Sequence, residues 1–254
     1  MKNLFYVFML QFVAIYMYGQ VSYLQYRVVP TEHEEEFILK ETEYWSKVAK
    51  AAIDKGQMLN WSLWERVGVT NTNAPNFVFV NGFKDFDSID QSAIWSEENL
   101  KQMGVTPAMV ETNSISTVYM DYWMQLEDAA GSNDYTYAVV NYGMPESLSG
   151  FITENKKLWK PLHEKNINAG KIGMTSWGLM STVHPQGKNA RFSCLTWDGF
   201  KSMAAALNYL RYRENSMTEG PLAEAISQSK MNEIIPGGFE YSILYRLVKR
   251  IEAE

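Results

Sequence analysis

The segment 37–56, FILKETEYWSKVAKAAIDKG, returns 114 positions later as segment 151–170, FITENKKLWKPLHEKNINAG. Both copies begin with Phe-Ile, carry a tryptophan at their ninth position and end on a glycine. The same shift produces further matches outside the two segments: Ser62 on Ser176, Phe83 on Trp197 and Phe86 on Phe200. A repeat at this spacing indicates a duplicated supersecondary unit, and such units bury a face against each other.

Hydrophobic spacing and turn residues predict the same order of elements in each repeat. In the first repeat, Thr31 and Glu34 form a capping-box pattern at the start of a helix, and Gly56 ends that helix. The expected elements of the first repeat are a strand at 22–29, a helix to about 55, strands at 59–67 and 76–83, helical segments at 87–103 and 107–114, and a strand at 116–127. Those of the second repeat are a strand at 135–142, a helix at 146–169, strands at 174–183 and 191–197, helical segments at 199–212 and 221–230, and a strand at 239–251.

This order is βαββαβ twice, which is the arrangement of two tandem ferredoxin-like units of the α+β class. The small, polar segment 129–134 is the expected linker between a unit at 20–128 and a unit at 135–254. A single unit has helices on only one face of its sheet, so the other face needs a cover. We expect the two units to pack sheet to sheet as a fused α+β barrel, because the strands carry bulky residues on both sides.

Tandem βαββαβ units with a long first helix resemble the dimeric α+β barrel superfamily, with both halves fused in one chain. The stretch WKPLH at 159–163, followed by Ala169-Gly170 and Trp177, is similar to uncharacterised exported proteins of the NIPSNAP-like and EthD-like kind. The resemblance covers about residues 21–251. It implies the barrel fold but leaves the activity open, because the superfamily includes stress-response barrels, cofactor-free monooxygenases and haem-binding enzymes.

Residues 1–19 have the pattern of a secretory signal peptide. Lys2 supplies the positive charge, and the apolar run 4–18 is broken only by Gln11. A membrane span needs roughly 20 apolar residues, which is more than this run provides. We therefore expect cleavage after Gly19, export to the periplasm or the extracellular space, and no membrane span in the mature chain. An uncleaved membrane anchor is the alternative.

Composition excludes several classes of site. The 254 residues carry a net charge of −6, and no cluster of Lys and Arg suits a nucleic acid. Cys194 is the only cysteine, so no intramolecular disulfide can form, and its alternating strand context predicts a buried thiol. With three histidines in the chain, a zinc site of several histidines has little material, and no metal is expected. The sequence has no dinucleotide, P-loop, zincin or nucleophile-elbow motif.

Polar residues on the strands are the first candidates for a site. Alternation places Tyr23 with Arg27 on one strand face, and Asp121 with Trp123 on another, while Arg246 lies on the last strand. We expect a single ligand pocket between the sheets, lined by these five residues, because unpaired charges inside a protein need partners or a ligand. Arginine charge and aromatic rings suit a small anionic or aromatic ligand. The alternative is a structural Arg–Asp pair near the barrel mouth.

The histidines give one weaker candidate. His163 follows Trp159 by one helical turn, and a neutral imidazole there could be an axial haem ligand or a general base. The first repeat has Ala49 at this position, so a single site and simple drift both explain the difference. An ordinary half-exposed histidine is the alternative. His184, in a turn before Pro185, and His33, in the acidic first turn of a helix, are expected to be solvated.

Two classes of function follow. The first is an exported barrel that binds a small ligand or serves as an interaction module, without a cofactor. The second is an oxygenase-type enzyme that uses haem at His163 or no cofactor at all. Residue types and spacing do not identify the ligand, the substrate or the oligomeric state.

Overall fold

The computed structural model describes residues 20–68, 73–170, 172–211 and 220–253. The expected signal segment, residues 1–19, lies outside the described residues. The strands are β1 (Val21–Val28), β2 (Asn60–Arg66), β3 (Phe77–Phe83), β4 (Thr117–Gly131), β5 (Tyr137–Gly143), β6 (Met174–His184), β7 (Cys194–Phe200) and β8 (Tyr241–Glu252). The helices are α1 (Glu34–Lys40), α2 (Ser46–Asp54), α3 (Gln91–Ile94), α4 (Glu97–Leu100), α5 (Leu148–Glu154), α6 (Lys160–Ala169), α7 (Met203–Leu210), α9 (Gly220–Gln228) and α10 (Met231–Ile234).

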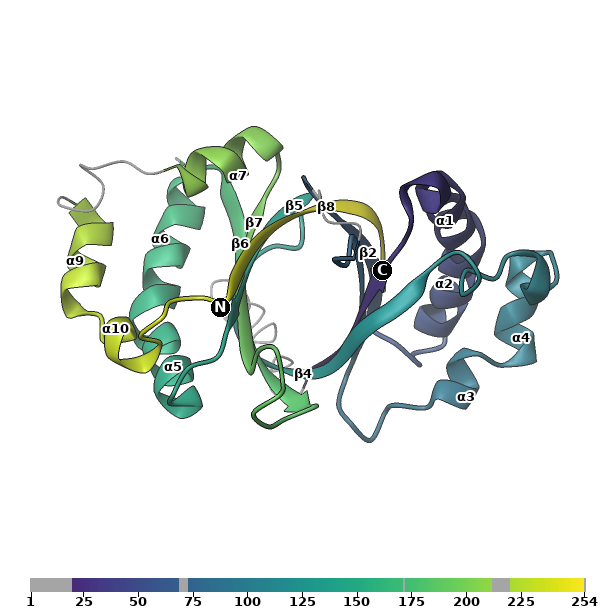
Figure 1. Ribbon diagram of the computed structural model, residues 1–254, viewed down its shortest axis with the longest axis horizontal. Coiled ribbons are helices and arrows are strands. Elements are labelled where there is room, and N and C mark those ends of the chain that lie inside the picture. The colour runs from purple at the N-terminus through teal and green to yellow at the C-terminus, as the bar shows by residue number, and fades with distance from the viewer. Residues whose placement is uncertain (1–19, 69–72, 171, 212–219, 254) are drawn as a thin grey trace, which may run out of the picture.

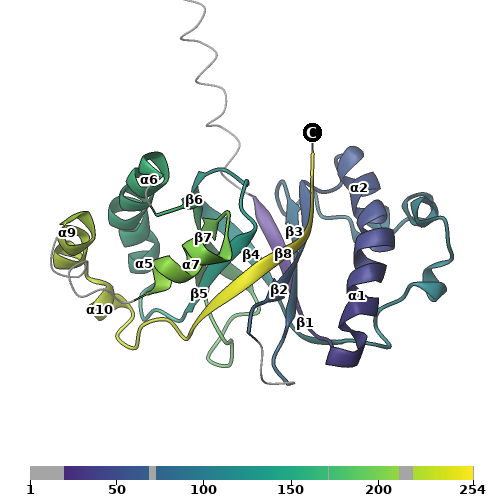
Figure 2. The same cartoon turned by 90° about the horizontal axis from the view of Figure 1, so that it is seen from above.

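The described strands close into one antiparallel barrel, in the order β1-β3-β2-β8-β5-β7-β6-β4. The first half contributes the run β4-β1-β3-β2, and the second half contributes β8-β5-β7-β6. The runs join where β2 pairs with β8 and where β4 pairs with β6. The expected barrel built from both halves is therefore confirmed, and it is one continuous sheet in which strands of the two halves hydrogen-bond to each other. Helices of the first half cover one side of this barrel and helices of the second half cover the opposite side, as two perpendicular views show (Figure 1 and Figure 2).

Side chains of the barrel strands alternate between an inner core and outer cores. Leu24 and Tyr26 of β1 belong to the inner core, together with Tyr122 and Met124 of β4. Phe37 of α1 belongs to an outer core, where the helices of the first half pack against β1, β2 and β3. Because both faces of the strands are covered, bulky residues occur at odd and even positions alike.

The long first helix of each half is interrupted at the same repeat position. A π-helical segment at Glu41–Trp45 joins α1 to α2, and another at Asn155–Trp159 joins α5 to α6. Gly170 ends α6 in the left-handed conformation, with φ 63°, and Gly56 follows α2 with φ 71°. Both glycines therefore end their helices as predicted, because only glycine adopts this conformation without strain.

The helix starts differ from the expected pattern. Residues Thr31–His33 form a 3-10 turn with no side-chain cap, so the prediction of a capping box between Thr31 and Glu34 is wrong. Glu34 instead accepts a hydrogen bond from Nδ2 of Asn76 at 2.8 Å, because the loop before β3 packs against this end of the helix. In the second half, Ser147 caps α5 by accepting from the backbone N–H of Gly150 at 3.1 Å.

The segment expected as a linker is partly strand. β4 continues to Gly131, and its last residues pair with β6, where Gly131 lies opposite Ser176. Residues 129–131 therefore hydrogen-bond across the junction between the halves. The small residues Ala129 and Ala130 suit this close pairing as well as they suit a linker, so composition alone does not reveal the end of the strand.

Two simpler expectations can be compared directly with the structure. Cys194 is fully buried in β7, and its thiol lies 3.5 Å from the carbonyl oxygen of Gly143, so the prediction of a buried thiol is confirmed. Burial raises the pKa of this thiol to about 12. Within the described ranges, no helix is long and apolar enough to cross a membrane.

Candidate functional site

Each half of the molecule has a cleft between its first helix and the outer face of its strands. The cleft of the first half has a volume of about 730 Å³ and that of the second half about 1150 Å³. Small-ligand sites are typically about 300–1,000 Å³. Trp45 lines the first cleft and its repeat partner Trp159 lines the second, so the clefts occupy equivalent positions. We call them the first and second outer clefts.

Four of the five strand residues predicted for a ligand pocket lie together, but not between the sheets. Tyr23, Arg27, Asp121 and Trp123 all line the first outer cleft. The alternation of the strands was right and the choice of face was inverted, because the opposite side chains of β1 and β4 fill the barrel interior. A covered outer face and a covered inner face give the same pattern of bulky residues in the sequence.

These residues form a connected polar network on the cleft wall. The Tyr23 hydroxyl donates to Oδ2 of Asp121 at 2.7 Å, and Nε2 of Gln25 donates to the Tyr23 oxygen at 3.1 Å. Nε of Arg27 donates to Oε1 of Gln25 at 2.8 Å. The Tyr23 ring also packs against Trp123, with centroids 4.9 Å apart. Burial, with the bond to Asp121 second, raises the pKa of Tyr23 to about 12, so this hydroxyl stays protonated as a donor.

Arg27 is held by neutral partners and not by Asp121. Its Nη1 donates to Asn113 at 2.9 Å and to Ser116 at 3.0 Å. Burial lowers the pKa of this guanidinium, while the nearby Glu41 opposes the shift. Glu41 is itself buried, and burial raises its pKa to about 7 although Thr112 donates to it. The Arg–Asp pair of the alternative interpretation is therefore absent among these residues, and Arg27 is connected to Asp121 through Gln25 and Tyr23.

Arg246 does not join this group. It lies on β8, its side chain is exposed, and its Nη2 pairs with Oε2 of Glu65 on the neighbouring strand β2. This bond raises the pKa of the guanidinium further. The cross-strand pair is a surface feature of the junction between the halves, so the structure separates Arg246 from the other predicted residues.

His163 lies in the second outer cleft. Although α6 places it at the helix flank as expected, it is buried, with 8% of its surface exposed. Its ring stacks on Trp177 of β6, with centroids 5.6 Å apart and planes 13° apart. Burial lowers the pKa of the imidazole to about 4, so the ring is neutral at physiological pH. The ordinary half-exposed histidine of the alternative interpretation is therefore not what the structure contains.

The second outer cleft also holds buried polar atoms that lack hydrogen-bond partners. Among the described residues, these are Nε1 of Trp159, Nδ1 of His163 and Oδ1 of Asp198. All three residues line this cleft. Nδ1 of His163 lies 3.8 Å from Oδ1 of Asp198, which is too long for a hydrogen bond. Unsatisfied buried polar atoms are costly, so their concentration in one cleft indicates a site for a ligand or bound water.

The first half satisfies the equivalent positions internally. Nε1 of Trp45 donates to the carbonyl oxygen of Val110 at 2.8 Å, whereas Trp159 has no such partner. Asn81 and Asp198 occupy equivalent positions, because Asn81 pairs with Tyr23 of β1 and Asp198 pairs with Val139 of β5. The side-chain amide of Asn81 donates to the carbonyl oxygen of Tyr23 at 3.2 Å. Ala49 replaces His163. The two clefts therefore share a framework, and only the second leaves its polar atoms open.

The sequence did not single out Asp198, which is the acidic partner in this cleft. It is buried on β7, and its other oxygen lies 3.4 Å from the amide nitrogen of Asn141. Burial raises its pKa to about 7, while hydrogen bonds from Asn141 and Tyr209 oppose the shift. One signal was present, because Asp198 is the single charged residue in the otherwise apolar and small run 194–200.

The other histidines lie outside the clefts. Nδ1 of His33 lies 3.7 Å from the Glu36 carboxylate at an exposed helix start, and His184 is exposed at the end of β6. In the part of the chain that the structure describes, no three His, Cys, Asp or Glu side chains are grouped to hold a metal ion. His163 is thus the one histidine that lines either outer cleft.

Comparisons with known proteins show the fold alone. No model of a known protein family matches the sequence, and no curated protein matches it. A candidate monooxygenase from Fusobacterium nucleatum superposes with a TM-score of 0.59 at 13% identity, over 92% of this chain and 95% of that one. A candidate monooxygenase from Lactobacillus acidophilus gives 0.58 at 9% identity, over 92% and 97%. A mutant chlorite dismutase from Candidatus Nitrospira defluvii gives 0.51 at 10% identity, over 91% of each chain.

The present chain shares its overall fold, a closed α+β barrel, with these neighbours. At sequence identities of 9–13%, the activity of these neighbours cannot be assigned to this chain. The function must therefore be argued from the clefts themselves.

Proposed function

We propose that this protein binds a small ligand or cofactor in the second outer cleft, with His163 as the group that holds it. The observation that carries the proposal is the set of unpaired buried atoms of Trp159, His163 and Asp198, all in one cleft. Among the described residues, the first half lacks such a set, because Trp45 and Asn81 donate to backbone carbonyl oxygens and Ala49 replaces His163. A ligand whose binding brought Nδ1 of His163 and Oδ1 of Asp198 into a hydrogen bond with each other, and which accepted from Nε1 of Trp159, would remove the cost of the unpaired atoms.

Haem is the cofactor whose chemistry suits these residues best. A neutral imidazole can donate its nitrogen lone pair to iron, and burial keeps His163 neutral. Asp198 lies beside Nδ1, where a carboxylate that accepts the Nδ1 proton would leave Nε2 free as a ligand. Trp159, Trp177 and Ile172 supply apolar lining. Bound haem would supply redox chemistry at its iron, while these residues would hold the imidazole and exclude water.

The corresponding activity would be oxygenase-type, and a non-catalytic ligand-binding barrel is the second form of the proposal. The fold is shared with two candidate monooxygenases, which supports the first form. Within this proposal the chain consists of two tandem ferredoxin-like units of the NIPSNAP-like and EthD-like kind, and its second unit carries the site. The first outer cleft, with Tyr23, Arg27, Asp121 and Trp123, is then the subsidiary candidate for a small anionic or aromatic ligand.

Haemin titration of the purified protein tests the proposal. The wild type should develop a shifted Soret band with one haem per chain, and His163→Ala should lose that band or weaken binding at least tenfold. His184→Ala is the matched control, because this histidine is exposed and does not line the cleft. Trp159→Phe should bind haemin with a smaller loss, since it removes only the unpaired N–H.

Three results would contradict this proposal. Haemin binding that is identical in wild type and His163→Ala would exclude His163 as the ligand. Absence of a shifted Soret band in the wild type would exclude haem and leave the cleft as a site for another ligand. A crystal structure could also show ordered water bound to all three unpaired atoms. If added cofactor did not displace that water, the observation on which the proposal rests would be removed.

We also propose that the protein is exported, with residues 1–19 removed as a signal peptide. The support is the apolar run 4–18 and the position of Gln20, which directly precedes β1. Intact-mass analysis of protein recovered from the periplasm or medium of an expressing host should give a chain that begins near Gln20. Retention of residues 1–19 in a membrane fraction would favour the anchor instead.

A further inference from the structure

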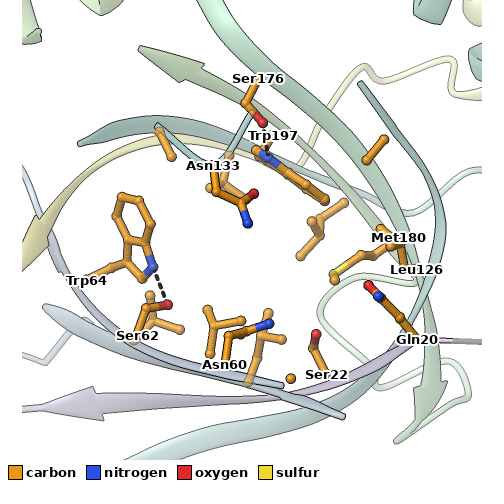
Figure 3. A pocket seen from close by; sticks show the side chains of 18 of the residues that line it. Gln20, Ser22, Asn60, Ser62, Trp64, Leu126, Asn133, Ser176, Met180 and Trp197 are labelled. Atoms are coloured by element: carbon orange, nitrogen blue, oxygen red, sulfur yellow. Dashed lines mark hydrogen bonds between the residues drawn. The ribbon is translucent and has the colours of Figure 1, made fainter. Parts of the chain in front are cut away.

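The barrel interior contains a cavity that none of the preceding functions uses. It has a volume of about 350 Å³ and lies at the end of the barrel where β1 begins and β8 ends. Tyr26, Tyr142 and Tyr245 close it on the inner side, and their hydroxyls are linked by hydrogen bonds of 3.2 and 3.1 Å. Figure 3 shows polar side chains from several strands directed into the space that remains.

Two tryptophans fix the polar groups on opposite walls of this interior cavity. Nε1 of Trp64 donates to Oγ of Ser62 at 2.9 Å, and Nε1 of Trp197 donates to Oγ of Ser176 at 3.4 Å (Figure 3). Ser62 and Ser176 are repeat partners, so the arrangement is duplicated. Each serine oxygen accepts from an indole, which leaves its own proton to be donated toward the cavity.

Two further polar groups in the cavity have no protein partner. Ser22 is 7% exposed, and no described residue hydrogen-bonds to its hydroxyl. The amide of Asn60 is also without a partner among the described residues, and Figure 3 shows it directed into the space. Gly82 on the neighbouring strand makes room for it, because a Cβ there would lie 2.4 Å from the Asn60 amide nitrogen. The cavity wall therefore accommodates the Asn60 amide, although no described residue hydrogen-bonds to this amide.

The described residues that line the cavity carry no net charge. The charged ones among them are Arg250 and Glu252, which lie 3.5 Å apart. The Arg250 guanidinium also stacks on Tyr135 at 4.6 Å and on Trp64 at 5.3 Å. A ligand with a net charge would find no free partner here, and the desolvation of its charge would oppose binding.

From this geometry we infer a second binding site, inside the barrel, for an uncharged aromatic molecule that carries a carbonyl or similar acceptor oxygen. The aromatic and aliphatic walls suit a flat apolar body. Ser22 and Asn60, which flank Gly82 on one wall, offer donors to its oxygen, and the hydroxyls of Ser62 and Ser176 are alternative donors on opposite walls. This site is separate from the second outer cleft, because neighbouring residues of one strand face opposite sides: Ser176 lines the interior cavity and Trp177 lines the cleft.

Calorimetric titration with three matched naphthalenes tests the inference on the full chain. 2-Acetylnaphthalene has the aromatic body and a carbonyl acceptor, 2-ethylnaphthalene lacks the acceptor, and 2-naphthoate replaces it with an anion. We expect 2-acetylnaphthalene to bind at least fivefold more tightly than either of the others. Asn60→Leu and Ser22→Ala should each weaken its binding about three- to tenfold without lowering the melting temperature, since neither side chain loses a protein partner.

The control is Asn189→Leu, which makes the same chemical change on an exposed turn and should leave binding unaltered. A crystal structure or intermolecular nuclear Overhauser contacts with the Trp64 and Trp197 rings should place the bound molecule inside the barrel. Equal affinity for all three naphthalenes, or affinity that survives the combined Asn60→Leu and Ser22→Ala variant, would overturn the inference. So would a bound molecule located in either outer cleft.

Discussion

The imidazole of His163 and the indole of Trp177 lie nearly parallel, 5.6 Å apart between centroids. The stack fixes the ring plane of His163 without a hydrogen bond, since its Nδ1 has no partner within hydrogen-bond distance among the described residues. Asp198 approaches this nitrogen to 3.8 Å. A small movement would therefore bring the pair within hydrogen-bond distance.

The first prediction concerns the pH dependence of Asp198→Asn. Asp198 has its pKa raised by burial to about 7, so the folded state holds this proton more tightly than the unfolded state does. Its contribution to stability is present at low pH and is lost as the pH rises through 7. Asp198→Asn should therefore be more stable than the wild type at pH 8, by about 1–3 kcal/mol. The difference in unfolding free energy between the variant and the wild type should be smaller at pH 5 than at pH 8, as measured by urea unfolding at both pH values.

The ionisation of His163 changes the stability with pH in the opposite direction to that of Asp198, so it provides the control. Its pKa is lowered by burial to about 4, so its contribution is present above about pH 6.5 and is lost as the pH falls through 4. In Asp198→Asn only the histidine contribution remains, and stability should fall more steeply between pH 6.5 and 4 than in the wild type. A variant that is less stable than the wild type at pH 8 would show that the hydrogen bonds from Asn141 and Tyr209 outweigh the cost of burying the Asp198 charge.

Most of the fold could be predicted from the sequence, because it depends on local patterns. The repeat, the strand alternation and the terminal glycines Gly56 and Gly170 each reflect a backbone requirement that neighbouring residues reveal. The extension of β4 to Gly131 was missed, since pairing with β6 is a long-range contact and Ala129 and Ala130 are neutral between strand and linker.

The site was less predictable for a specific physical reason. In a barrel covered by helices, both faces of each strand are buried, so hydrophobicity does not distinguish the inner face from the outer one. Tyr23 and Arg27 were therefore correctly grouped and placed on the wrong side. Asp198 is a candidate site residue only because it lies beside His163. These two residues come from elements that the sequence does not place next to each other.

Arg27→Ala tests whether the first outer cleft is structural or binds a ligand. Its guanidinium makes three hydrogen bonds to Gln25, Asn113 and Ser116, so we expect a loss of about 2–3 kcal/mol in unfolding free energy. Arg27→Lys should recover only part of it, because an ammonium group does not reproduce the guanidinium geometry. Unchanged stability together with lost affinity for 2-naphthoate would assign Arg27 to ligand binding instead.

Expression of residues 20–130 alone tests how far the halves depend on each other. This fragment would lose the pairing of β2 with β8 and of β4 with β6, and it would expose the inner face with Leu24, Tyr26 and Tyr122. Unpaired edges and a large apolar face favour association. Size-exclusion chromatography with light scattering should show aggregates or a dimer, and a stable monodisperse monomer would contradict the shared barrel.

Gly178→Ala tests the packing that shapes the interior cavity. The ring of Trp197 lies directly over Gly178, and a Cβ at this position would come within 1.9 Å of it. The indole must then move, which weakens its bond to Ser176 and reduces the space beside it. We expect a loss of about 1–3 kcal/mol, the usual cost of overpacking, and at least threefold weaker binding of 2-acetylnaphthalene. Gly237→Ala is the control, because its Cβ would meet no atom within 4 Å. Urea unfolding and calorimetry of both variants give the comparison, and wild-type stability in Gly178→Ala would show that Trp197 is free to repack.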